Sequence, residues 1–221
     1  MEHSLKKEGI IMTNTTKWRW IFYMGGLVVV ALGISLTIKG YKLGIGPWDV
    51  FHVGLYQKFG LTIGSWSIIA GLIIIGSTAI IFRELPKIGT WLNMLLLGIF
   101  IDIFNFIIPD VETFWIQFIM FVLGVIIMGY GVGIYMSPNI GAGPRDSLML
   151  VFVEKFGFSI KRVRTSIEVI VAIVGWLLGG PVGIGTVIIA LLIGQFVHFT
   201  LPQAKALLLK LAGETEESIS W

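Results

Sequence analysis

Two aspartates occupy the same place in a repeated motif, which makes them the leading candidates for chemistry. The segments GIGPWDVF and GAGPRDSL place Asp49 and Asp146 two residues after a proline, and Gly46 and Gly143 just before it. Proline favours the first position of a helix, where a carboxylate complements the helix dipole and can accept unpaired N–H groups. Each carboxylate therefore either caps its own helix or faces a shared cavity as a cation or proton site. The exposed N–H groups of such helix ends are equally suited to an anion.

The residues beside these aspartates differ between the two copies of the motif. Trp48 corresponds to Arg145, and an arginine beside a glycine-rich helix start is suited either to contact an anion or to anchor the chain at the cytoplasmic face. His52 follows Asp49 by three residues, so the two would share a helix face, but its counterpart is Met149. His52 is therefore a binding candidate whose simpler role is a structural hydrogen bond.

Polar residues inside the apolar runs form a second set of candidates, because ionisable groups are costly in a membrane. Asp102 and Asn105 are three residues apart, as are Gln195 and His198, so each pair would share one face of a helix. These four residues either line a polar path that moves a proton or lie near helix ends and reach interfacial water.

The composition indicates that these candidates belong to a membrane protein. Of the 221 residues, 56% are hydrophobic and 13% are charged, whereas an ordinary soluble domain has about 25% charged residues. A helix needs about 20 mainly apolar residues to cross a bilayer. Cutting the chain at its charged residues gives six runs of that kind, at 20–38, 61–82, 88–108, 113–136, 163–180 and 182–201.

An internal repeat relates the two halves of the chain. The segment GIGPWDVFHVGLYQKFGLTI aligns with GAGPRDSLMLVFVEKFGFSI at an offset of 97 residues, and IGTWLNMLLLGIFIDIF aligns with IGTVIIALLIGQFVHF at an offset of 96. Each half then holds one long run, the motif segment and two more runs. If the short, polar motif segment does not cross the membrane, each half crosses three times, and the second half enters from the opposite side.

The predicted fold is therefore an all-α, polytopic membrane bundle of six transmembrane helices in two inverted three-span repeats, each with a short re-entrant or interfacial helix. Its predicted parts are a polar N-terminal tail (1–17), repeat 1 (18–108), repeat 2 (109–201) and a cytoplasmic C-terminal tail (202–221). Lys and Arg in short loops favour the cytoplasm, and their distribution predicts that both termini are cytoplasmic. Lys39, Lys42 and Lys58 contradict this pattern, because they fall on the outer side.

Several classes of function lack the residues they need. The excess of basic residues gives a net charge of +3, but these residues lie between apolar runs, which suits a membrane surface better than a nucleic acid. The sequence has no cysteine, no nucleotide-binding glycine motif, and no H-E-x-x-H or G-x-S-x-G motif. We therefore expect no enzymatic activity, no cofactor, no metal site and no nucleic-acid partner.

The motif segments also carry a family resemblance. The run GIGPWDVFHVGLYQKFGLTIGSWSIIAGLIIIG, with GAGPRDSLML and VRTSIE in the second half, resembles the YczE family of bacterial membrane proteins, often grouped with YyaS and YitT proteins. The resemblance covers residues 20 to about 201. It implies a multi-pass protein of the bacterial plasma membrane. Members are linked to antibiotic or lipopeptide production by genetic neighbourhood, which assigns no molecular activity and no catalytic residues.

Two functional hypotheses follow. The first is a small secondary transporter or permease for an unidentified small molecule or ion, with Asp49 and Asp146 at its central site and Asp102 as a coupling residue. The second is a non-transporting accessory protein that supports or regulates membrane-associated biosynthetic enzymes. A lipid-modifying enzyme ranks third, because no catalytic constellation supports it. The bilayer is the expected surrounding, and a homodimer is compatible with so small a chain.

Overall fold

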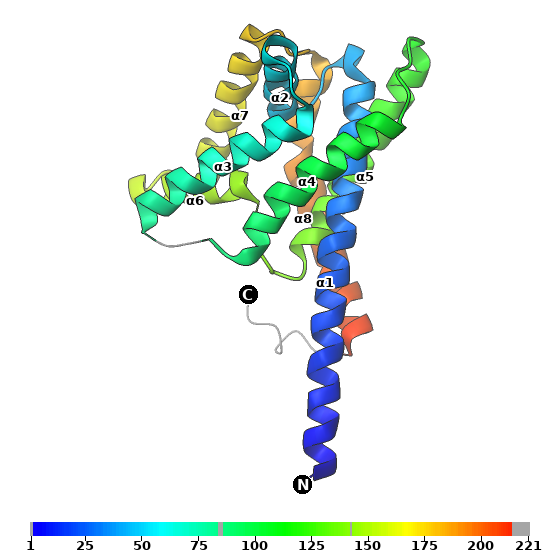
Figure 1. Ribbon diagram of the computed structural model, residues 1–221, viewed down its shortest axis with the longest axis vertical. Coiled ribbons are helices and arrows are strands. Elements are labelled where there is room, and N and C mark those ends of the chain that lie inside the picture. Colours follow the sequence, from blue (N-terminus) through cyan, green and yellow to red (C-terminus); the bar gives the residue numbers. More distant parts are fainter. Residues whose placement is uncertain (1, 84–85, 142, 214–221) are drawn as a thin grey trace.

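The computed structural model describes residues 2–83, 86–141 and 143–213, although the side chains of residues 2–14, 82, 146, 147, 150, 151, 154, 160 and 161 fall outside the described set. These described residues form helices and no strand, as the sequence predicts (Figure 1). In chain order the helices are α1 (Glu2–Lys39), the 3-10 helix η1 (Tyr41–Leu43), α2 (Pro47–Phe59), α3 (Ile63–Phe82), α4 (Ile88–Ile107), α5 (Phe114–Met136), α6 (Pro144–Phe156), α7 (Ile160–Leu177) and α8 (Ile184–Ala212).

Five of these helices are long and apolar enough to cross a membrane: residues Thr15–Lys39, Ile63–Ile81, Ile88–Ile107, Phe114–Met136 and Ile184–Ala212. They correspond to five of the six predicted runs. The remaining run became α7, whose first turns contain Arg162, Arg164 and Glu168 and therefore lack the composition of a spanning helix. The chain is thus a multi-pass, all-helical membrane protein.

The two predicted tails continue long helices. Residues 2–17 belong to α1, which extends well below the other helices in Figure 1. Residues 202–212 belong to α8, which passes through Pro202 without ending. The predicted tail residues 214–221 lie outside the described residues.

Glycines allow α1 and α5 to pack closely along their length. A Cβ atom added to Gly33 would lie 2.5 Å from the backbone nitrogen of Met128, and one added to Gly131 would lie 2.6 Å from that of Val30. Small residues permit such backbone contact between membrane helices, where dispersion forces drive association. The buried core extends from this pair toward α4 and α8, and it includes Tyr23, whose hydroxyl donates to the carbonyl oxygen of Gly89.

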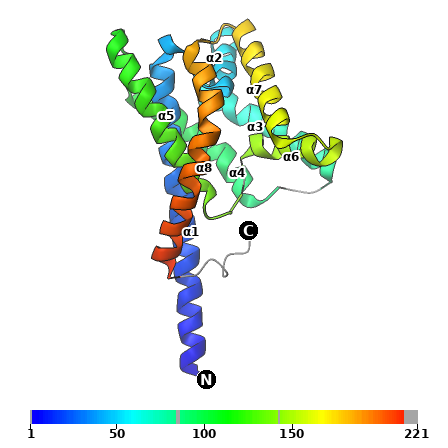
Figure 2. The same cartoon turned by 180° about the vertical axis from the view of Figure 1, so that it is seen from behind.

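The short helices α2 and α6 have the same length and the same residue types at their ends. Each has 13 residues, begins with proline after a glycine N-cap, and ends at a glycine. Each packs against a helix of the other half of the chain: α2 lies against α7, and α6 lies against α3. Figures 1 and 2 show α2 near the upper end of the molecule and α6 lower down on the flank.

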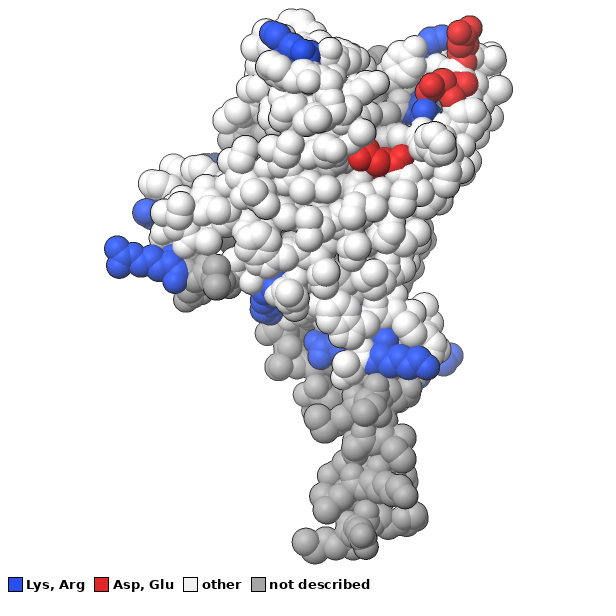
Figure 3. Space-filling model, in the orientation of Figure 1, with Lys and Arg blue, Asp and Glu red and all other residues white. Residues whose placement is uncertain are grey.

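The surface is consistent with a lipid environment. Large apolar side chains are exposed on several helices, including Ile80 on α3, Phe106 on α4 and Leu177 on α7. On the face shown in Figure 3, most Lys and Arg residues lie toward the lower end, the acidic residues lie at the upper right, and a broad uncharged band separates them. Such a band is expected where the hydrocarbon core contacts the protein.

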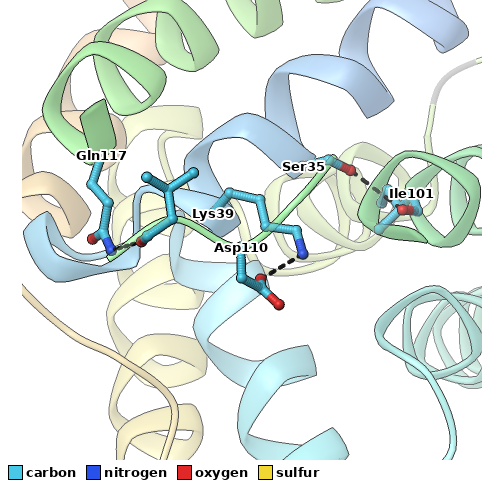
Figure 4. A network of polar contacts seen from close by, with 6 residues as sticks. Ser35, Lys39, Ile101, Asp110 and Gln117 are labelled. Atoms are coloured by element: carbon cyan, nitrogen blue, oxygen red, sulfur yellow. Dashed lines mark hydrogen bonds and ion pairs between the residues drawn. The ribbon is translucent and has the colours of Figure 1, made fainter. Parts of the chain in front are cut away.

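The acidic loop between α4 and α5 (residues 108–113) provides partners for two of the three lysines that fall on the predicted outer side. Lys39 pairs with Asp110 at 2.6 Å, and Lys42 donates to the carbonyl oxygen of Glu112 at 2.6 Å. Gln117 also holds this loop, because its side-chain amide donates to the carbonyl oxygen of Val111 (Figure 4). Lys39 and Lys42 therefore have partners at the end of the bundle opposite the N-terminus.

Candidate functional site

The two repeated motifs line one cavity of about 210 Å³. Residues 46–49 contribute from the start of α2, and residues 143–145 contribute from the start of α6. All eight α-helices supply lining residues, and much of the wall is apolar, including Ile34, Ile74, Met128 and Ile189. The motifs are about a hundred residues apart in sequence, and the folded chain brings them to the same buried space.

Asp49 lies in the first turn of α2 and lines this cavity. The residue is only 3% exposed, and its Oδ1 atom has no hydrogen-bond partner among the described residues. Its Oδ2 atom lies beside Gly46, since a Cβ atom added there would be 2.6 Å from it. A helix cap would have bound its carboxylate to backbone N–H groups. Capping therefore does not account for Oδ1.

His52 lies one turn further along α2 and is 1% exposed. Neither ring nitrogen has a hydrogen-bond partner within the described part of the chain, so the expected structural hydrogen bond is not found there. The imidazole contacts the rings of Trp48 and Phe51, with centroid distances of 6.3 and 5.8 Å. A buried imidazole without partners is costly, which marks His52 as a binding candidate.

The electrostatic surroundings set the charge states of these two residues, which lie on α2 and outside the five spanning helices. Burial raises the pKa of the Asp49 carboxyl to about 6, and the nearby Arg145 guanidinium opposes that rise. Burial also lowers the pKa of His52 well below its ordinary value, and Arg145 acts in the same direction. Burial thus disfavours the charged form of both side chains, whereas Arg145 favours the ionised form of Asp49 and the neutral form of His52.

Arg145 and Trp48, which occupy equivalent positions in the two copies of the motif, contact each other. The guanidinium carbon of Arg145 lies 4.9 Å from the centroid of the Trp48 ring, a cation–π distance. Arg145 also lines the cavity. Asp146 belongs to α6, but its side chain lies outside the described residues, so its pairing with Asp49 stays a prediction.

The structure does not bring the second set of candidates to this cavity. Asp102 instead accepts hydrogen bonds from the Thr62 hydroxyl at 2.5 Å and the Gly64 N–H at 2.8 Å, and so ties α4 to the start of α3. Asn105 has both side-chain polar atoms buried without a partner in the described region, away from the cavity lining. Asp102 has a structural role in this geometry.

Gln195 and His198 lie on exposed positions of α8 and do not line the cavity. The polar path predicted through them and through Asp102 stays a prediction.

Other polar lining residues were not chosen from the sequence. Asn93 and Tyr135 face the start of α6, because a Cβ atom added to Gly143 would lie 3.2 Å from the Asn93 side-chain oxygen and 3.7 Å from the Tyr135 hydroxyl. Arg164 pairs with Glu168 at 3.3 Å, as their spacing predicts, and both line the cavity. The signal for Asn93 was present, since it is an amide within an apolar run.

Comparison with known proteins shows which family the chain belongs to. The model of the family of unknown function DUF6198 matches residues 17–202. The chain is 52% identical over 190 residues to the uncharacterized membrane protein YczE of Bacillus subtilis, covering 86% of this chain and 88% of that protein. It is 30% identical to the uncharacterized protein YyaS of the same organism, covering 83% of this chain and 92% of that protein.

An uncharacterized protein of Haemophilus influenzae is 33% identical over 178 residues, which are 79% of each chain. No solved structure matches the chain. The family match includes both motifs. The chain therefore belongs to the family of unknown function DUF6198 and is a relative of YczE and YyaS.

Proposed function

We propose that this protein is a small secondary transporter or permease for a small molecule or ion, with its central site between the starts of α2 and α6. The observation that carries the proposal is the buried cavity lined by both motifs, in which Asp49 and His52 have polar atoms without a described partner. Secondary transporters commonly bind substrate where interrupted helices of two repeats meet near the bilayer midplane. The proposal assigns no catalytic reaction to the chain.

The proposed mechanism uses six crossings arranged as two inverted repeats, with α7 as the crossing that carries charge. Contacts between the halves support this symmetry, because equivalent residues make equivalent contacts. A Cβ atom added to Gly185 would lie 2.7 Å from the carbonyl oxygen of Leu43, and one added to Gly89 would lie 2.7 Å from that of Ile140. The repeat relates Gly89 to Gly185 and Leu43 to Ile140. Rocking of one repeat against the other would then expose the cavity to alternate sides.

The orientation can be tested because the chain has no cysteine. Lys58 and Lys155 occupy equivalent positions near the ends of α2 and α6, and both are exposed. Lys58→Cys and Lys155→Cys should react with a membrane-impermeant maleimide from opposite faces, Lys58→Cys from outside and Lys155→Cys from the cytoplasm. From the distribution of Lys and Arg in short loops, we also propose that both termini lie in the cytoplasm of the bacterial cell. Labelling of both variants from one face would contradict the inverted repeat.

Transport itself is tested with the purified full chain in proteoliposomes. Solute-driven currents and osmotic swelling are recorded for a panel of inorganic ions, amino acids, organic acids and sugars. Asp49→Asn should abolish the flux of any solute that the protein moves, whereas Asp110→Asn should not, because that carboxylate lies in the exposed loop. No flux above that of empty liposomes, together with capture of a biosynthetic enzyme by the chain, would favour the accessory role instead.

A further inference from the structure

Two buried side chains of α2 line the cavity and have polar atoms without a hydrogen-bond partner. Asp49 and His52 are three residues apart in this helix, a spacing that places them on the same face. We propose that the cavity binds a small uncharged molecule through hydroxyl or amide groups, which both donate and accept hydrogen bonds. This inference rests on the proposed central site and names the class of its substrate.

Three polar atoms of these residues define what a ligand must supply. Asp49 is 3% exposed and its Oδ1 atom has no partner in the described structure, and His52 is 1% exposed with both ring nitrogens in the same condition. A neutral imidazole has one nitrogen that donates and one that accepts, whereas a carboxyl group accepts when ionised and can also donate when protonated. Leaving such groups buried without partners is costly. The ligand must therefore offer both donors and acceptors.

A charged ligand meets this demand poorly. An ammonium group only donates hydrogen bonds, and a carboxylate only accepts them. Burial raises the pKa of Asp49 and lowers the pKa of His52, so their surroundings disfavour charge on either side chain. The charge of a ligand would be subject to the same cost of burial. A hydroxyl or an amide group donates and accepts without adding a charge.

The remaining wall of the cavity suits the apolar part of such a molecule. Ile34, Ile74 and Ile189 line it from α1, α3 and α8, and Met128 lines it from α5. The cavity volume of about 210 Å³ is below the range of about 300–1,000 Å³ that holds drug-sized ligands. A short carbon chain with one or two polar groups, as in 1,2-propanediol, matches both the size and the mixed polarity of the site.

The experiment measures binding to the purified full chain in lipid nanodiscs by saturation-transfer NMR titration at neutral pH, with empty nanodiscs as the blank. The uncharged probes are 1,2-propanediol, glycerol, propionamide and urea. The diol is compared with lactate and 1-amino-2-propanol, which keep one hydroxyl and carry one charge. Propionamide is compared with propionate and propylamine in the same way. We expect each charged analogue to bind at least about tenfold more weakly than its uncharged parent, which corresponds to about 1.4 kcal/mol.

Variants test whether Asp49 and His52 hold the ligand. Asp49→Asn and His52→Leu should each weaken binding of the tightest uncharged probe by at least about tenfold. His52→Gln keeps a donor and an acceptor and should bind more tightly than His52→Leu, a difference that a purely structural role of the ring does not predict. Asp110→Asn is the matched control and should bind as the wild type does, because that carboxylate lies in the exposed loop. Size-exclusion profiles and tryptophan fluorescence report whether each variant is folded.

The outcomes separate this inference from the proposed transport. The inference is wrong if a charged analogue binds as tightly as its uncharged parent, or if Asp49→Asn and His52→Leu bind as the wild type does. It is also wrong if no uncharged probe binds above the blank, since water alone would then fill the site. In each of these cases, flux of another solute that depends on Asp49 would leave the transport proposal intact. If an uncharged probe binds as described but no flux is found in proteoliposomes, the inference stands and the transport proposal fails.

Discussion

Two adjacent glycines of α1 provide a sharp test of how this bundle is held together. Gly25 has no atom within 4 Å of the position where a Cβ would lie. At Gly26 the same atom would lie 2.3 Å from the backbone nitrogen of Tyr135 and 2.7 Å from its Cα. Alanine at the first position therefore adds a methyl group to open space, whereas alanine at the second drives a methyl group into the backbone of α5.

The size of the effect follows from these distances. Ordinary van der Waals contact begins at 3.4 Å, so Gly26→Ala must separate α1 from α5 locally by about 1 Å, or bend one of them. Overpacking of this kind costs about 1–3 kcal/mol, and alanine for glycine in an open helix position stabilises by about 1 kcal/mol. We therefore expect the free energies of unfolding of Gly25→Ala and Gly26→Ala to differ by about 2–4 kcal/mol.

Thermal unfolding in detergent micelles measures this difference through tryptophan fluorescence, since the chain has 8 tryptophans. For a chain of this size, the expected difference corresponds to a gap in Tm of about 4 to 16 °C. Size-exclusion chromatography after heating provides an independent readout. The two variants melting within about 2 °C of each other would refute the packing of α1 on α5 through Gly26. Tyr135 also lines the cavity, so Gly26→Ala should weaken ligand binding as well.

The same unfolding assay checks three further contacts. Asp102→Ala removes the acceptor for Thr62 and the start of α3 and should cost about 1–3 kcal/mol; an unchanged Tm would show that α3 does not need this contact. Thr200→Val removes the buried hydroxyl that donates to the Gly129 carbonyl oxygen at 3.0 Å and should cost about 1 kcal/mol, so a gain in stability would contradict it. Asp110→Asn breaks an exposed ion pair with Lys39 and should change stability by less than about 1 kcal/mol; a larger loss would mean that the acidic loop holds the bundle together.

The sequence was most informative about the helices whose ends carry their own signals. Proline after glycine predicted the starts of α2 and α6, and five of the six predicted apolar runs correspond to helices long and apolar enough to span a membrane. The sequence was least informative about α7. The start of α7 contains Arg164 and Glu168, which line the cavity, and a count of charges along a segment cannot distinguish an inward-facing pair from a segment that leaves the membrane.

The cavity was only partly predictable for a different physical reason. The repeat placed Asp49 and Arg145 at equivalent helix starts, but their approach depends on how the other helices rotate about their axes. Those rotations are set by packing contacts between distant segments, such as Gly26 against Tyr135. For that reason Tyr135 and Asn93 could not be assigned to the cavity from the sequence. Gln195 and His198 lie at exposed positions of α8, and the polar path through them stays a prediction.

The contact between Trp48 and Arg145 yields one more prediction from the proposed symmetry. In an inverted repeat, residues near the pseudo-two-fold axis meet their own counterparts, so identical residues here would give two arginines or two tryptophans. The observed pair is complementary, with the guanidinium 4.9 Å from the ring centroid, and is worth about 0.5–2 kcal/mol. Trp48→Arg should destabilise the protein by more than that amount, because it places two like charges together in a buried site.

Exchanging the two residues tests whether stability depends on the contact itself or on which residue occupies each position. If the helix starts are equivalent, the double variant Trp48→Arg with Arg145→Trp rebuilds the same pair and should recover at least half of the stability lost in Trp48→Arg. A double-mutant cycle measures this coupling between the two positions. Losses that simply add would mean that the two sides of the cavity are not interchangeable. The position of each of the two residues would then be fixed by the surrounding helices rather than by their contact.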